Sequence, residues 1–199
     1  MASQPTVDIR DIHFILFELL DMEELGRFPA FSGLSRAECE ESLRLASRIS
    51  NDILYDANRE ADRVGIGYDP ATKEVRIPAG MKKALAAYYD AGFLRISDSH
   101  DEGGMGMPET IAFACNEIFT AASLSFFTYP ILGHGNAPLL RNFGTDEQRA
   151  LYMENILSGR WGGSMCLTEP GAGSDVGALR TRATRLPDGS YRITGQKIF

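Results

Sequence analysis

Cysteine is scarce in this chain. Only three of its 199 residues are cysteine, and Cys39, Cys115 and Cys166 lie far apart in the sequence. They form no CxxC pair and no Cys/His cluster, so the sequence predicts neither a disulfide framework nor a zinc site. Sparse cysteine is typical of proteins in a reducing compartment, and we expect the protein to be cytoplasmic with no metal ligands.

An excess of positive charge and long hydrophobic runs are also missing. Lys and Arg number 20 against 27 Asp and Glu, which gives a net charge of −7. Such a chain suits neither nucleic-acid phosphates nor an anionic membrane surface. Residues 1–11 lack the basic and apolar regions of a signal peptide. The apolar run at 12–20 contains His13 and Glu18 and is shorter than the ~20 residues that cross a bilayer. We therefore expect neither nucleic acid nor membrane as a partner.

The first 160 residues have the apolar spacing of helices. Ser35 with Glu38, and Thr145 with Gln148, are capping boxes that mark helix starts. The breaker-rich residues 26–34 and 66–79 read as connections, the second with a short extended piece at 74–78. The predicted helices cover 8–25, 35–64, 80–91, a stretch after Pro108, 131–143 and 145–159.

The pattern changes after Arg160, where short extended runs replace helices. We expect strands at 161–168, 178–184, 191–194 and from 196 onward, with a hairpin turn at Asp188-Gly189. So few strands leave unpaired edges, so we expect the chain to be the first part of a longer protein.

The predicted fold is α+β: a mainly α-helical N-terminal domain followed by the beginning of a β-domain. Its predicted parts are an N-terminal helical extension at 1–34, the main helical domain at 35–160, and the start of the β-domain at 161–199.

The run LTEPGAGSD at 167–175 is the segment that points to chemistry. Gly171 and Gly173 let backbone N–H groups approach a ligand, and Thr168 and Ser174 add hydroxyls. Such a loop suits a ligand with phosphates and a polar heterocyclic edge. It has neither the Lys of a P-loop nor the GxGxxG spacing of a dinucleotide fold. On the residues alone, a glycine-rich connection without a ligand stays open as the alternative.

The runs MCLTEPGAGSDV at 165–176 and ITGQKIF at 193–199 resemble the flavin-binding signature of acyl-CoA dehydrogenases. The run FGTDEQR at 143–149 and the glycine-rich region at 92–106 are similar to further segments of that family. The additional N-terminal helix resembles the long subgroup that includes 3-methylmercaptopropionyl-CoA dehydrogenase. In this family a C-terminal helical bundle follows the β-domain, and that bundle is absent from the sequence.

The resemblance implies an FAD cofactor held by six residues of this sequence: Met165, Leu167, Thr168, Gly173, Ser174 and Phe199. Met165, Leu167 and Thr168 would line the flavin ring, with the Thr168 hydroxyl at its pyrimidine edge. Ser174 would lie at the flavin diphosphate and near the substrate thioester. Phe199 occupies a place where many members have Trp.

The implied reaction is α,β-dehydrogenation of an acyl-CoA thioester, with hydride transfer to flavin N5. The family's catalytic base is a Glu of the C-terminal bundle, so no catalytic residue is assigned in this chain. The implied partners are an acyl-CoA substrate and electron-transfer flavoprotein or a similar acceptor, with a homo-oligomer as the assembly. Two alternatives stay open: a non-catalytic fragment or interaction module, and an acyl-CoA oxidase-like flavoprotein.

Several conspicuous residues have a structural interpretation that we favour over a functional one. Glu169 precedes a proline in a turn, which favours a structural role over catalysis. His100 and His134 are single histidines in different segments, typical of loop or packing residues. We expect Cys166 to be a small buried strand residue and Trp161 to anchor the core.

An aromatic group and a glycine-rich loop are open to two interpretations. Phe119, Phe126, Phe127 and Tyr129 either pack in the core, which we favour, or line an acyl-chain pocket. The loop at 102–107 either connects two helices flexibly or flanks a substrate.

Overall fold

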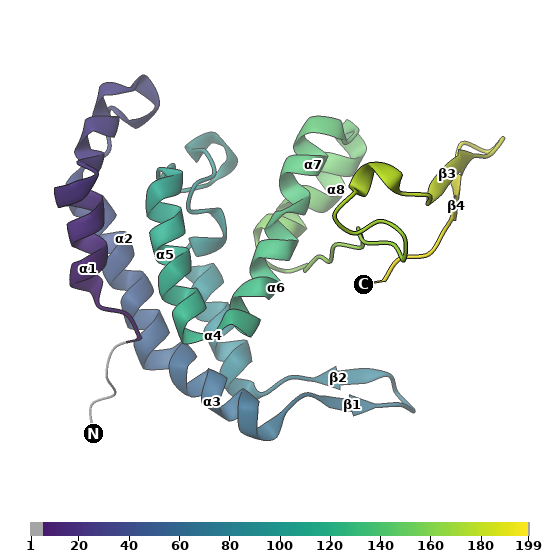
Figure 1. Cartoon of the computed structure of the whole chain (residues 1–199), viewed down its shortest axis with the longest axis horizontal. Coiled ribbons are helices and arrows are strands. Elements are labelled where there is room, and N and C mark those ends of the chain that lie inside the picture. Colours follow the sequence, from purple (N-terminus) through teal and green to yellow (C-terminus); the bar gives the residue numbers. More distant parts are fainter. Residues whose placement is uncertain (1–5, 199) are drawn as a thin grey trace. The chain divides into compact units, whose positions relative to one another are not determined.

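A computed structural model describes residues 6–198 of the chain. These residues form two compact units, one up to Gly162 and one from Gly163 onward. The first, called here the helical unit, is built from helices and one small hairpin; the second, the C-terminal unit, contains loops and two short strands (Figure 1). The predicted α+β class, with helices first and strands after them, is confirmed. Within residues 6–198, no helix is long and apolar enough to cross a membrane.

The N-terminal segment is helical over 9–19 and then continues as short 3₁₀ turns, rather than forming one helix over 8–25 as predicted. The helix cannot continue past Asp21, because the φ of this residue is +45°, a left-handed value. Ile12 and Leu16 are buried, whereas Leu19 and Leu20 on the predicted apolar face are exposed. The elements are α1 (Ile9–His13), the π-helical turn η1 (Phe14–Leu19), and the 3₁₀ turns η2 (Met22–Arg27) and η3 (Pro29–Phe31).

One long helical rod follows, made of α2 (Arg36–Ile49), a π-helical turn η4 (Ser50–Leu54) and α3 (Tyr55–Val64). The predicted capping box is confirmed, because the Glu38 N–H donates to Ser35 Oγ and the Ser35 N–H donates to Glu38 Oε2. The rod ends at Gly65, where φ is +72°.

A β-hairpin stands where a connection was predicted. Strands β1 (Gly67–Asp69) and β2 (Glu74–Arg76) pair antiparallel and extend away from the helices (Figure 1). The Asp69 carboxylate accepts from the N–H of Ala71 at 2.9 Å and stabilises the turn. Helix α4 (Ala79–Asp90) follows and closes at Gly92, as the sequence predicts.

Helix α5 (Glu109–Ala122) packs against α2 and supplies the centre of the core. Its apolar face is fully buried at Ile111, Cys115, Ile118 and Phe119. The Phe119 ring lies 5.0 Å from Tyr88 and 4.9 Å from Phe93, both edge-on, which is a favourable aromatic geometry.

The loop between α4 and α5 contains two 3₁₀ turns, η5 (Phe93–Arg95) and η6 (His100–Glu102). The flexible loop predicted at 102–107 is held by backbone hydrogen bonds. The N–H of Gly106 donates to the Asp98 carbonyl at 2.9 Å, and that of Met107 donates to the Ile96 carbonyl at 3.0 Å. A Cβ at Gly104 would lie 2.1 Å from the Asp98 carbonyl oxygen, so this close approach requires glycine.

Two helices replace the single one predicted at 131–143. Helix α6 (Leu124–His134) starts at the N-cap Ser123, and α7 (Asn136–Phe143) begins after a break at Gly135. The prediction was wrong because it missed Ser123, whose Oγ accepts from the Phe126 N–H at 3.2 Å. Helix α8 (Asp146–Leu157) begins with the Thr145 capping box, as predicted.

The C-terminal unit has one antiparallel hairpin and a 3₁₀ turn, η7 (Val176–Ala178). Strand β3 (Arg182–Arg185) pairs with β4 (Tyr191–Thr194) across a turn in which Gly189 has a φ of +85°. The second predicted strand therefore begins four residues later than expected. The strands predicted at 161–168 and from 196 onward are not formed within the described residues. The two stretches are joined by the backbone hydrogen bond from the Ile198 N–H to the Thr168 carbonyl, and they do not form the ladder of hydrogen bonds that a sheet requires.

Candidate functional site

The segment predicted to bind a ligand contains a run without regular secondary structure and a tight turn. Residues 163–168 form neither helix nor strand, and the chain then folds back at Glu169, which pairs with Ala172. The two residues exchange N–H···O bonds of 3.0 and 3.1 Å around Pro170 and Gly171. The turn therefore fixes the end of the run at 163–168.

Glu169 is the centre of this turn. Its side chain is 7% exposed. One carboxylate oxygen accepts from the Arg180 N–H at 2.7 Å, and the other from the Thr181 N–H at 3.0 Å and Lys197 Nζ at 2.9 Å. The Arg180 N–H and the Lys197 ammonium lower the pKa of Glu169 to about 2. A carboxylate so fully engaged holds structure together, in agreement with the structural interpretation.

Lys197 lies beside the same segment and was not among the residues singled out from the sequence. Its Nζ contacts both the Leu167 carbonyl oxygen and Glu169 Oε1 at 2.9 Å. The adjacent Ile198 N–H donates to the Thr168 carbonyl. Lys197 and Glu169 are 28 residues apart, so no local pattern could join them. The one available signal was a lysine within the ITGQKIF run.

The predicted ring-lining residues lie on the run at 163–168. Met165 is 63% exposed and Leu167 is 41% exposed, while Thr168 is half-buried. A Cβ placed on Gly173 would lie 3.7 Å from Thr168 Cγ2, so the structure brings these two residues together. Ser174 is exposed in the following loop, and Phe199 lies outside the described residues.

The donor set of this run fits a flavin. Within residues 6–198, the backbone N–H groups of Met165, Leu167 and Thr168 and the Thr168 hydroxyl have no protein partner. Unpaired donors beside exposed apolar side chains suit a flat ring with acceptors along one edge. The Glu169 carboxylate accepts hydrogen bonds from three protein donors. Its negative charge is therefore directed at those donors and not at a phosphate-bearing ligand.

A partly buried cluster of charged residues ties the glycine-rich loop of the helical unit to α6 and α7. His134 Nε2 lies 3.0 Å from Asp98 Oδ2, and Arg141 Nε lies 2.6 Å from Glu102 Oε1. Burial opposes ionisation of Asp98, but the hydrogen bond from His134 and the nearby Arg141 outweigh it and lower the Asp98 pKa. His134 therefore has a structural role as the hydrogen-bond partner of the Asp98 carboxylate. His100 is a loop residue whose Nδ1 lies 3.2 Å from the Gly104 carbonyl oxygen.

Two other expectations are wrong. Cys166 is exposed, because the run that carries it forms no sheet among the described residues. Trp161 is 41% exposed and packs edge-on against Tyr152 of α8 at 5.9 Å instead of anchoring the core. Within the part of the chain that the structure describes, no group of three or more His, Cys, Asp or Glu residues could hold a metal ion.

The four aromatic residues fall into different environments. Phe119 and Phe126 are buried, as the core interpretation predicts. Phe126 also lines, with the half-exposed Tyr129, a cavity of about 670 Å³ bounded by α3, the β1–β2 hairpin, α4 and α6. Phe127 instead lines the groove described next.

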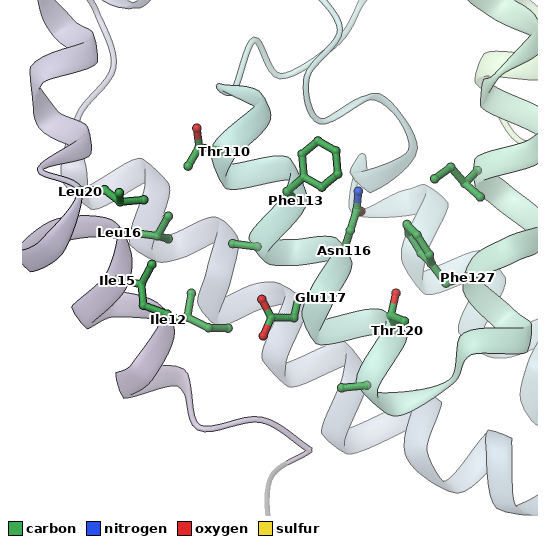
Figure 2. Close-up of a pocket in the computed structure, with 13 residues that line it drawn as sticks. Ile12, Ile15, Leu16, Leu20, Thr110, Phe113, Asn116, Glu117, Thr120 and Phe127 are labelled. Carbon is green, nitrogen blue, oxygen red and sulfur yellow. The ribbon is translucent and has the colours of Figure 1, made fainter.

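A second hollow of about 710 Å³ runs between the N-terminal turns and α5 (Figure 2). It is mainly apolar, with polar groups along α5. Figure 2 shows the labelled side chains Ile12, Ile15, Leu16, Leu20, Thr110, Phe113, Asn116, Glu117, Thr120 and Phe127 around it.

Comparison with known proteins gives a consistent result. The family model described as acyl-CoA dehydrogenase, N-terminal domain, matches residues 67–160. The 3-methylmercaptopropionyl-CoA dehydrogenase of Ruegeria pomeroyi is 32% identical over 96% of this chain, which covers 32% of that protein. The broad-specificity linear acyl-CoA dehydrogenase FadE5 of Mycobacterium tuberculosis is 35% identical over 96% of this chain, which covers 31% of that protein.

The fold is also that of a solved structure. Butyryl-CoA dehydrogenase from Megasphaera elsdenii superposes with a TM-score of 0.66 over 84% of this chain and 41% of that chain, at 24% identity. The chain spans about a third of the length of the curated relatives named above.

Proposed function

Because the chain belongs to the acyl-CoA dehydrogenase family, we propose that it forms the N-terminal helical domain and the first flavin-contacting segment of an FAD-dependent acyl-CoA dehydrogenase. The observation that carries the proposal is the run at 163–168, where Met165 and Leu167 are exposed. Lys197, which also contacts the Glu169 carboxylate, donates to the Leu167 carbonyl near the end of this run. Exposed apolar side chains and unpaired N–H groups are left for a ligand.

The residues of the chain would divide the work of holding the cofactor. Met165 and Leu167 would offer apolar surface to the ring, and Thr168 would orient its polar edge through its hydroxyl and N–H. Gly173 would leave room beside Thr168, and the Ser174 hydroxyl would donate to a phosphate or approach the thioester. Phe199 would pack near the ring.

FAD, when bound, supplies the hydride acceptor for α,β-dehydrogenation of an acyl-CoA thioester. Glu169 is a poor candidate for the base that removes the α-proton, because its carboxylate is bound to three donors and its pKa is about 2. We assign no catalytic base to this chain. Electron-transfer flavoprotein or a similar acceptor, a homo-oligomeric assembly and a cytoplasmic location are parts of the same proposal.

FAD titration of the purified chain tests the cofactor assignment. We expect saturable but weak binding, seen as a change in flavin fluorescence, because one short run offers little surface to enclose the cofactor. Thr168→Val should weaken binding, whereas Thr72→Val in the β1–β2 turn of the helical unit should leave it unchanged. An absence of any saturable change, or equal binding by Thr168→Val and the unaltered chain, would contradict the assignment.

Reduction of the flavin tests the reaction. In the complete gene product, addition of an acyl-CoA should bleach the visible flavin absorbance without oxygen. A flavoprotein that binds FAD but is not bleached by butyryl-CoA or by octanoyl-CoA would retain the cofactor assignment and lose the dehydrogenase assignment. Rapid reoxidation by oxygen would instead support the oxidase alternative.

A further inference from the structure

Lys197 makes two contacts through its side-chain ammonium group, one with a backbone carbonyl and one with a carboxylate. Its Nζ lies 2.9 Å from the Leu167 carbonyl oxygen and 2.9 Å from Glu169 Oε1. The Lys197 side chain is 26% exposed, so most of it is shielded from solvent. A charge-assisted bond from an ammonium group is stronger than a neutral one, so the Leu167 carbonyl is held in place.

The direction of the Leu167 carbonyl decides the direction of the next N–H group. In a trans peptide the C=O of one residue and the N–H of the next point to opposite sides. Among the described residues all peptide bonds are trans. The Thr168 N–H therefore points away from Lys197, and within residues 6–198 it has no protein partner.

The Glu169 carboxylate does not need Lys197 to stay in place. It also accepts from the N–H groups of Arg180 and Thr181, which lead into β3. Loss of the ammonium group would thus leave the turn anchored to the hairpin. The contact that would disappear without replacement is the one to the Leu167 carbonyl.

We propose that Lys197, held by Glu169, is a positioning residue that aims the Thr168 N–H at an acceptor on the edge of the flavin ring. The inference rests on the proposed function, because it takes the flavin as the ligand of this run. It adds to that function a residue outside the TEPGAGSD motif. Lys197 acts through the backbone rather than by touching the cofactor.

The test compares Lys197→Met with Lys83→Met, a matched change of an exposed lysine in α4. Without ligand, NMR of the chain should show the Leu167 carbonyl carbon and the Thr168 amide shifted in Lys197→Met only. Hydrogen exchange at the Arg180 and Thr181 amides should be unchanged, since both still donate to Glu169. An unshifted Leu167 carbonyl overturns the proposal whatever FAD does.

The second part uses FAD as the probe, followed at the Thr168 amide. The dissociation constant should rise about tenfold in Lys197→Met, the order expected for one misdirected hydrogen bond. Lys197→Arg should restore part of the affinity because a guanidinium group can still donate to both oxygens. Lys83→Met should bind as the unaltered chain does.

Three results would overturn the positioning role. Equal FAD affinity in Lys197→Met and the unaltered chain contradicts it directly. Loss of affinity together with faster exchange at Arg180 and Thr181 shows that Lys197 only maintains the fold. If the unaltered chain gives no FAD response at the Thr168 amide, the FAD assignment fails and the positioning role fails with it.

Discussion

Asp98 of the glycine-rich loop and His134 of α6 are joined by a contact of 3.0 Å between Oδ2 and Nε2. The Asp98 side chain is 7% exposed, and Arg141 of α7 lies 3.8 Å from its other oxygen. One buried carboxylate thus connects a loop to residues of two later helices, and the first of them, His134, is 36 residues further along the chain. The loop's position depends on this cluster as well as on its own backbone bonds.

Replacing Asp98 should therefore destabilise the helical unit. Asp98→Ala leaves His134 and Arg141 without their shared partner, and we expect a loss of about 2–4 kcal/mol in the free energy of unfolding. Urea denaturation followed by circular dichroism measures this loss. Asp101→Ala removes an exposed carboxylate of the same loop and should change stability by less than about 0.5 kcal/mol. Equal effects of the two changes would contradict the role of the cluster.

Two phenylalanines of α5 offer a test of the core. Phe119 is fully buried among aromatic rings, whereas Phe113 on the same helix is 69% exposed. Phe119→Ala should cost about 3–5 kcal/mol of unfolding free energy, because it removes apolar contacts and leaves a cavity. Phe113→Ala should cost less than about 0.5 kcal/mol. Thermal or urea unfolding that ranks the two variants the other way would mean that α5 is rotated.

Gly104 should tolerate no side chain. A Cβ there would meet the Asp98 backbone at 2.1 Å, a distance that requires the loop to move. Gly104→Ala should therefore lower stability by about 1–3 kcal/mol, as overpacking does elsewhere. Gly33→Ala is the matched control, because no atom lies within 4 Å of its Cβ position. The melting temperatures of the two variants give the comparison. A Gly104→Ala variant as stable as the unaltered chain would show that the Gly104 backbone does not lie against the Asp98 carbonyl.

Acid should loosen the C-terminal unit through Glu169. The pKa of Glu169 is lowered from 4.5 to about 2, first by the Arg180 N–H and then by Lys197. A lowered pKa means that the ionised form stabilises the folded state. This contribution is complete above about pH 4.5 and is lost as pH falls toward 2. Hydrogen exchange at Arg180 and Thr181, corrected for its intrinsic pH dependence, should accelerate over this range.

Glu169→Gln is the control for that titration. Its side chain has no charge to lose, so exchange at the same two amides should already be faster at neutral pH and should not change further between pH 4.5 and 2. A variant with the same pH profile as the unaltered chain would assign the acid sensitivity to another group.

Features encoded by neighbouring residues could be predicted from the sequence. Ser35 with Glu38 needs only one turn of chain to form its capping box, and Gly92 ends α4 through its own φ of +79°. The α-then-β order could be predicted for the same reason. The break at Asp21 could not, because apolar residues continue at helical spacing on both sides of it.

Features that depend on distant residues could not be read from local patterns. The run at 161–168 was predicted to be a strand, yet a strand also needs a partner along its length, and the Thr168 backbone accepts only the bond from the Ile198 N–H. In the candidate site, the loop around Thr168 and Ser174 could be recognised from its glycines and hydroxyls. Lys197 could not, because its contacts with Leu167 and Glu169 span about 30 residues of chain.

The π-helical turn η4 acts as an extra residue placed within the rod of α2 and α3. Each residue of an α-helix turns the chain by about 100°, so this turn sets the direction in which every later side chain of the rod faces. Deleting Asp52 would remove no apolar residue from the rod. It would still rotate Asn58 away from Ser123, whose Oγ donates to Asn58 Oδ1 at 2.8 Å. The number of residues in the rod, independent of their type, thus determines the direction in which the β1–β2 hairpin leaves the helices.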